Sequence, residues 1–176
     1  MRKNPFATDN GSMRPLTETE VRDALANATD EERREFSLPL DFLLTEWDGV
    51  EAIGWRDPRF PARGYLVVEH DDDPVAVVVH AARGANSRHR AAICNLCHTQ
   101  QPADQVALFS ARRSGDAGAK GDTVGTYICA DLSCEENVRL PVPPAPSEVQ
   151  PAGFTARRAE GFARRARAFV SGVLGG

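Results

Sequence analysis

The chain contains the stretch ICNLCH at residues 93–98 and the stretch ICADLSC at residues 128–134, which together hold all of its cysteines. The spacing is C-x2-C, a gap of 31 residues, and then C-x4-C. Two close pairs on separate turns can bring four sulfurs to one tetrahedral point, which is the arrangement that zinc favours. We therefore expect one zinc ion, bound by Cys94, Cys97, Cys129 and Cys134.

Other uses of these cysteines stay open on the sequence alone. The two pairs could form two disulfides, although a cytosolic protein keeps its thiols reduced. Cys94 and Cys97 could act as a redox pair, but the sequence around them lacks the expected βαβ order. His98 or Asp131 could replace one sulfur ligand. Four cysteines close a zinc site to water, so we expect a structural metal and no enzymatic activity.

The elements around the cysteines predict a treble-clef zinc finger at about residues 91–140. The knuckle Cys94-Asn95-Leu96-Cys97 is followed by two β-prone runs at 106–111 and 123–128, which indicate a hairpin. The second run delivers Cys129, and a short helix is expected from there to about residue 140. Knuckle, hairpin and helix in this order are typical of the treble clef.

The rest of the chain predicts a small antiparallel sheet with flanking helices, an α+β fold. The β-branched runs 65–68 and 75–79, separated by an Asp- and Pro-containing turn, indicate a hairpin buried on both faces. A capping box at Thr17–Glu20 begins an amphipathic helix expected at about 18–35. We expect irregular structure over 41–64, packed on the core by Phe42, Leu43, Leu44, Trp47, Ile53 and Trp55.

The ends of the chain differ from this central part. Residues 1–13 are polar and aperiodic, and we expect a disordered leader with Met13 as the functional start. Residues 14–174 are expected to form one domain, in which a proline-rich linker at 141–153 precedes an arginine-rich amphipathic helix at 154–174.

Composition excludes some classes of function. The formal net charge of -4 argues against a general nucleic-acid or membrane-surface binder. The acids gather in residues 16–51, which carry eleven acids and three arginines, whereas residues 83–128 and the last helix are basic. No run of about 18 apolar residues is present, and no apolar segment follows the basic residues at the start. We therefore expect a cytoplasmic protein with no membrane association.

Several motifs resemble the elongation factor G-binding protein family, which includes the FusB-type fusidic acid resistance proteins. The resemblance covers about residues 14–174 and is carried by GWRDP (54–58), YLVV (65–68), ICNLCH, VALFSARR (106–113) and VGTYICADLSC (124–134). It implies the four-cysteine zinc site, and it implies that the protein binds translation elongation factor G and promotes its release from the ribosome. FusB-type proteins carry a helical bundle before the zinc domain, whereas one helix is expected here. Factor binding can thus be retained in a housekeeping relative without drug resistance.

The hairpin beside the zinc site is the expected contact surface for this partner. Its Gly-rich basic loop, 112–122, and the strand that follows present basic and aromatic side chains; the expected contacts are Phe109, Arg112, Arg113, Lys120 and Tyr127. Strand alternation places Tyr127 opposite Ile128, and hence outward if Ile128 is buried. The alternative function is direct binding of ribosomal RNA or another nucleic acid by the basic residues of the treble clef.

Overall fold

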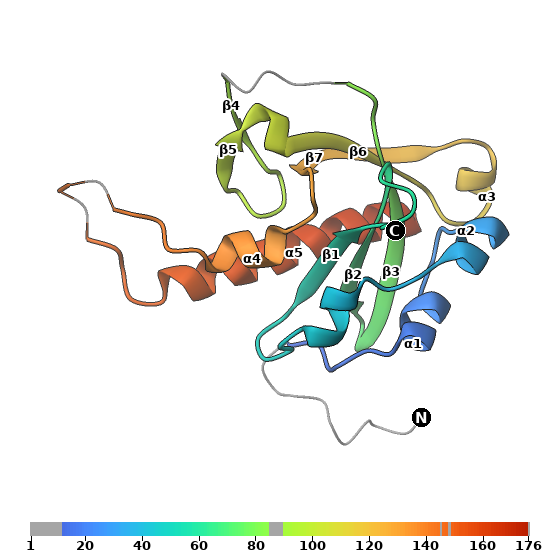
Figure 1. Ribbon diagram of the computed structural model, residues 1–176, viewed down its shortest axis with the longest axis horizontal. Coiled ribbons are helices and arrows are strands. Elements are labelled where there is room, and N and C mark those ends of the chain that lie inside the picture. The colour runs from blue at the N-terminus through green and yellow to red at the C-terminus, as the bar shows by residue number, and fades with distance from the viewer. Residues whose placement is uncertain (1–11, 85–89, 145, 148, 176) are drawn as a thin grey trace.

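The computed structural model describes residues 12–84, 90–144, 146–147 and 149–175, and its centre is a five-stranded antiparallel sheet in the order β1-β2-β3-β6-β7 (Figure 1). Its strands are β1 (Ala52–Arg56), β2 (Arg63–His70), β3 (Asp73–Ala81), β6 (Val106–Arg112) and β7 (Thr123–Cys129). A two-stranded sheet is formed by β4 (Ala91–Ile93) and β5 (Gln100–Pro102). The helical elements are α1 (Glu18–Asp23), α2 (Asp30–Glu35), η1 (Leu40–Leu44), η2 (Ala103–Gln105), α3 (Gly115–Ala119), α4 (Cys134–Arg139) and α5 (Phe154–Leu174). The expected α+β class is confirmed.

The sheet separates two hydrophobic cores. On one face, Leu66, Val68, Val77 and Val79 pack with the cysteines and with α5. On the other face, strand residues such as Tyr65 pack with the N-terminal segments. The β2–β3 hairpin is therefore buried on both faces, as its continuous apolar runs predict.

The helix expected at about 18–35 is two short helices, α1 and α2. Residues between them leave the helix to cover the edge of β3: the Ala26 amide donates to the Ala76 carbonyl, and the Ala76 amide donates to the Ala24 carbonyl. A second capping box, formed by Thr29 and Glu32, then begins α2. A single helix was the wrong prediction because the unpaired backbone of β3 takes these hydrogen bonds instead.

The Asn27 side chain completes this edge. Its oxygen accepts from the Val78 amide at 2.7 Å, and its Nδ2 donates to the Val78 carbonyl at 3.0 Å and to the Arg112 carbonyl at 2.8 Å. Strands β3 and β6 pair at His80–Ser110 and Ala81–Phe109, and the Ala82 amide donates to the Leu108 carbonyl just beyond β3. One buried amide therefore bridges the two strands where they diverge.

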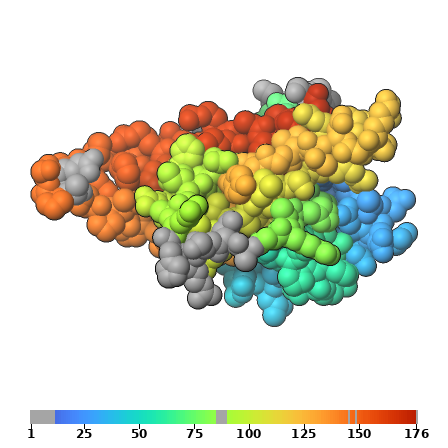
Figure 2. All heavy atoms as spheres, turned by 90° about the horizontal axis from the view of Figure 1, so that it is seen from above, coloured from blue at the N-terminus to red at the C-terminus, as the bar shows by residue number. Residues whose placement is uncertain are grey.

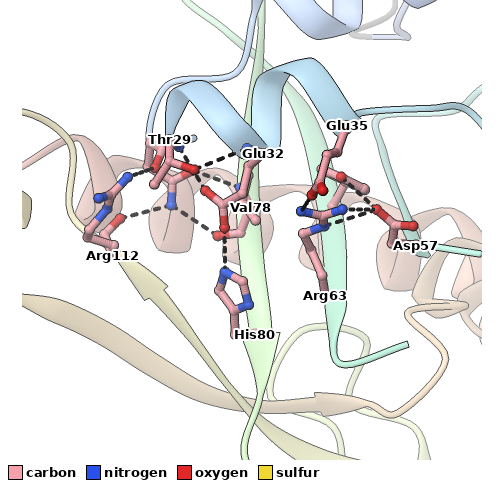
Figure 3. Close-up of polar contacts among 10 residues, drawn as sticks. Thr29, Glu32, Glu35, Asp57, Arg63, Val78, His80 and Arg112 are labelled. Atoms are coloured by element: carbon pink, nitrogen blue, oxygen red, sulfur yellow. Dashed lines mark hydrogen bonds and ion pairs between the residues drawn. The ribbon is translucent and has the colours of Figure 1, made fainter. Parts of the chain in front are cut away.

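The segment expected to be irregular over 41–64 contains strand β1, which pairs with β2 along its whole length. The tight loop after it is held by Asp57, whose buried carboxylate accepts from Tyr65 Oη and Arg63 Nε, both at 2.9 Å (Figure 3). Burial alone would raise the pKa of Asp57, but hydrogen bonds from the Arg59 amide, Tyr65 and Arg63 hold that pKa below its usual value. These contacts explain the GWRDP motif as a structural corner.

The core residues predicted in this segment are partly wrong. Phe42 and Trp55 are buried, but Leu43 and Leu44 are 72% and 79% exposed. The five-residue 3-10 helix η1 turns Phe42 inward and leaves the two residues after it outside.

The two ends of the chain pack differently from each other. Helix α5 has the predicted bounds and buries Phe162, Phe169 and Val173 against the sheet. Met13, expected in a disordered leader, is buried, and its amide donates to the Val50 carbonyl at 2.6 Å. Residues 1–11 of that leader lie outside the described residues. Within the described part of the chain, no helix has the length and apolar character needed to cross a bilayer.

Candidate metal centre

The four cysteines converge on one point. Their Sγ atoms all lie within 4.8 Å of one another, and all four residues are buried. The Cys97 and Cys129 sulfurs are 3.5 Å apart, and the Cys94 and Cys134 sulfurs are 3.6 Å apart. These separations are far beyond a disulfide bond of about 2.05 Å. They approach the value of about 3.8 Å that four Zn–S bonds of about 2.3 Å give in a tetrahedron.

The first two ligands come from a turn between β4 and β5. The Cys94 amide donates to the Thr99 carbonyl at 3.2 Å, and the His98 amide donates to the Cys94 carbonyl at 3.0 Å. His98 adopts a φ of 56°, which reverses the chain just after Cys97. Its side chain is exposed and outside the sulfur cluster, as is that of Asp131, so neither replaces a cysteine in the convergent set.

The other two ligands flank a loop that is inserted against the main sheet. Cys129 ends β7 and Cys134 begins α4. Between them, buried Leu132 has a φ of 65° and lies over two strand glycines. A Cβ built on Gly64 would be 2.4 Å from Leu132 Cδ1, and one built on Gly54 would be 3.2 Å from Leu132 Cβ. The longer C-x4-C spacing thus supplies an apolar residue that anchors the metal centre to β1 and β2.

Two of the sulfurs accept hydrogen bonds from backbone or side-chain amides. The amides of Leu96 and Cys97 both donate to Cys94 Sγ at 3.4 Å. The Cys129 sulfur accepts from two side-chain amides. Gln101 Nε2 donates to Cys129 Sγ at 3.2 Å, and Asn137 Nδ2 donates to it at 3.4 Å. Such bonds to sulfur stabilise thiolate over thiol and fix the direction of its lone pairs.

Helix α5 holds the two halves of the centre together. Arg165 Nε donates to the Leu96 carbonyl at 2.6 Å, within the knuckle. Arg158 donates to the Asn137 carbonyl at 3.0 Å and to Thr99 Oγ1 at 3.2 Å. Figure 2 shows α5, in red, running beside the segment that carries the knuckle. A zinc ion with four thiolates carries a net charge of -2, so these two guanidinium groups also oppose that charge.

The sulfurs cannot all ionise without a cation. Contact with the Cys129 and Cys134 thiols lowers the pKa of Cys94, whereas contact with Cys129 and Cys94 raises the pKa of Cys134. A bound divalent cation removes this conflict because it stabilises every thiolate at once. The donor set, its separations and its closed geometry therefore fit one structural zinc ion, with Cys94, Cys97, Cys129 and Cys134 as its ligands.

The fold and the four-sulfur centre define a zinc-binding protein of the treble-clef type. The family model described as the FBP C-terminal treble-clef zinc-finger matches residues 20–173, and the chain belongs to that family. No curated protein and no solved structure gave a significant match.

The five residues expected to contact a partner occupy different environments. Phe109 is fully buried and stacks under the Arg56 guanidinium, 4.9 Å from its ring centroid, so its assignment to a contact surface was wrong. It faces the core because strand alternation places Phe109 and buried Ala111 on the side opposite exposed Leu108. Tyr127 is 50% exposed, opposite buried Ile128, as the strand alternation predicts. Lys120 is exposed at the end of α3.

The two predicted arginines are half-buried and bind the scaffold. Arg112 Nη2 donates to the Asn27 carbonyl at 2.8 Å, and the Arg113 guanidinium donates to the Gly172 carbonyl in α5. The loop between them and β7, expected to be irregular, contains the short helix α3. Both guanidinium groups therefore fix the loop end of the β6–β7 hairpin.

An exposed leucine beside Tyr127 was missed by the sequence reasoning. Leu108 is 37% exposed and is the cross-strand partner of Tyr127. The Asn95 amide in the zinc knuckle donates to the Tyr127 carbonyl at 2.8 Å, and Asn95 Nδ2 donates to Thr126 Oγ1. Because neighbouring side chains in a strand point to opposite faces, recognising Phe109 as a core residue would have predicted that Leu108 is exposed. The metal knuckle thus holds the strand that presents this apolar pair.

Proposed function

We propose that the protein binds translation elongation factor G through the outer face of the β6–β7 hairpin and promotes release of the factor from the ribosome. The observation that carries the proposal is the exposed Leu108–Tyr127 pair, held rigid by the zinc knuckle in a chain of this zinc-finger family. The resemblance of its motifs to those of FusB-type proteins supports elongation factor G as the partner. Exposed aromatic residues on a fixed strand are frequent anchors in protein interfaces.

The mechanism in this proposal is binding, without chemistry. Four cysteine ligands leave no coordination position for water, so the zinc ion has a structural role. Selective contacts to one conformation of the factor shift its population away from the ribosome-stalled state. Tyr127 and Leu108 supply the apolar contact, Lys120 supplies a charge in the loop of the hairpin, and Arg112 and Arg113 hold the hairpin in place.

Binding is tested with purified elongation factor G by biolayer interferometry. We expect Tyr127→Ala to weaken binding by about tenfold, because exposed aromatic anchors contribute more than about 1 kcal/mol. Leu140→Ala is the matched control, since Leu140 is 55% exposed on a different element and should leave affinity unchanged. Each variant is first shown to retain one zinc ion. A wild-type protein that ignores the factor at low and moderate salt would contradict the proposal.

Release is tested separately by pelleting ribosomes that carry the factor and fusidic acid. Added protein should move the factor into the supernatant, and Tyr127→Ala should do so less well.

Direct nucleic-acid binding is the competing outcome: affinity for ribosomal RNA should then fall steeply with added salt. The guanidinium groups of Arg112 and Arg113 donate to backbone carbonyls. They are therefore less available to bind RNA phosphates than the sequence suggests.

A further inference from the structure

A second exposed apolar surface lies away from the zinc centre. The side chains of Leu40, Leu43 and Leu44 are 82%, 72% and 79% exposed, and all three belong to η1. Single exposed leucines are common, but three on one turn form a contiguous apolar ridge. In Figure 1 this segment, in cyan, is well separated from the β6–β7 hairpin. We call these three residues the leucine ridge.

The ridge is held rigidly by the core beneath it. Phe42, between the leucines, is buried and packs edge-on against Trp47 and Trp55, with ring centroids 5.2 and 5.1 Å away. The Phe42 amide donates to the Pro39 carbonyl, and the Thr45 amide donates to the Phe42 carbonyl. The leucines therefore cannot turn inward without extracting Phe42, and a partner meets them already ordered.

The charged side chains next to the leucines in the sequence are acidic, since residues 35–55 contain five acids and no lysine or arginine. Two of these acids, Glu35 and Glu51, pair with Arg63 and Arg167, and the Arg139 guanidinium donates to the Gly49 carbonyl. Asp41, Glu46 and Asp48 are exposed beside the leucines, and no ion pair involves them within the described residues. These three carboxylates repel nucleic acid and anionic membranes and favour a positively charged partner.

We propose that the leucine ridge is a docking surface for a cationic amphipathic segment of a protein partner. The apolar side of that segment would cover the leucines, and its lysines or arginines would pair with Asp41, Glu46 and Asp48. Leucines at i, i+3 and i+4 suit a helical partner, whose anchors repeat with similar spacing. This surface is independent of the zinc face and of elongation factor G, so the protein has two separate places for partners.

The proposal is tested with a fluorescein-labelled helical peptide of leucine and lysine. Its affinity for the zinc-loaded full chain is measured by fluorescence anisotropy at about 0.05 M and about 0.3 M salt, which brackets strong and weak screening. We expect the Leu40→Ser, Leu43→Ser, Leu44→Ser triple variant to bind at least about tenfold more weakly. The acid variant Asp41→Asn, Glu46→Gln, Asp48→Asn should lose most of the salt dependence.

Matched controls distinguish binding at the leucine ridge from non-specific binding to exposed apolar side chains. Val149→Ser changes a side chain that is 90% exposed elsewhere and should bind the peptide as the wild type does. A peptide with glutamate in place of lysine should not bind. If the triple variant fails to fold, Leu40→Ser alone is used, since Leu40 is the most exposed of the three.

Three results would overturn the proposal. One is an affinity for the lysine peptide that the leucine changes do not alter. Another is equal binding of the glutamate peptide. The third is a wild-type dimer, seen by sedimentation, that the leucine changes convert to a monomer, because the ridge would then be an interface between two copies of this chain.

Discussion

Cys129 differs from the other ligands because side-chain amides, rather than backbone amides, donate to its sulfur. Those donors can be removed by substitution, which makes this sulfur the most informative single atom of the metal centre. Sequence spacing identified the four ligands, but it could not identify Gln101 or Asn137. Their role depends on β5 and α4 meeting at Cys129, which is a property of the folded chain.

We predict that Asn137→Leu and Gln101→Leu each speed the transfer of zinc to a colorimetric chelator. Losing a hydrogen bond to a ligand typically costs about 10-fold or more in metal affinity, and the thiolate becomes easier to protonate. Gln100→Leu is the control, because its exposed neighbouring side chain makes no contact with sulfur. Equal transfer rates in all four proteins would show that these amides do not stabilise the thiolate.

Glu32 links α2 to the sheet and should contribute to stability in a pH-dependent way. A hydrogen bond from His80 Nε2 at 2.9 Å, with further bonds from Thr29, lowers the pKa of Glu32 to about 2. A carboxyl whose pKa is lower in the folded chain stabilises the fold fully above its unfolded pKa, and this contribution is lost as the pH falls toward about 2.

We predict that Glu32→Gln lowers the free energy of unfolding by about 1–3 kcal/mol at neutral pH, the usual cost of removing a charged hydrogen-bond partner. The measurement is urea denaturation of the zinc-loaded proteins. Glu31→Gln, one position away and exposed, should change little. A loss that is as large in Glu31→Gln would mean that net charge, and not the contact with His80, is responsible.

At the scale of elements, the loop from Cys129 to Cys134 joins the metal centre to the sheet through Leu132. We predict that Gly64→Ala destabilises the protein by about 1–3 kcal/mol, since overpacking at a filled site has that cost. The added methyl would collide with Leu132 and displace the loop between two ligands, so zinc affinity should fall as well.

Gly125→Ala is the matched control for this experiment. It also adds a methyl group in a strand, but the nearest atoms would be 3.5 Å away, an ordinary contact distance. Thermal unfolding and zinc competition are measured for both variants. The role assigned to Leu132 would be wrong if the two variants behaved alike.

The elements differ in how far the sequence could predict them. Helix α5 was predicted to the residue, because a proline-rich segment before it and glycines after it bound one periodic run. The prediction of a single helix at 18–35 was wrong, although a second capping box at Thr29–Glu32 was visible in the sequence. What the sequence could not show was that β3 has an open edge, which draws residues 24–27 out of the helix. Leu43 and Leu44 of η1 were placed in the core for a similar reason: composition predicts burial, and only the turn geometry shows which side chains point inward.

For the molecule as a whole, the cysteines are members of the core that α5 covers, so metal and fold should be lost together. We predict that a strong chelator lowers the unfolding temperature by at least about 10 °C, because a structural zinc ion supplies folding free energy directly. Circular dichroism should show one cooperative transition, as both cores share β2 and β3. Added zinc should restore the original temperature, and an unchanged transition would contradict a structural role for the metal.

The divergence of β3 and β6 bears on how the protein can evolve. The sheet is two half-sheets that share two residue pairs, and the Asn27 amide spans the gap beside them. One half, β1–β3, carries the N-terminal layer with the leucine ridge, and the other, β6–β7, carries Cys129 and the Leu108–Tyr127 pair. Substitution of Asn27 would remove this bridge and leave all four cysteines intact. Asn27 is therefore a position at which evolution can loosen the contact between the half that carries the leucine ridge and the half that carries the Leu108–Tyr127 pair.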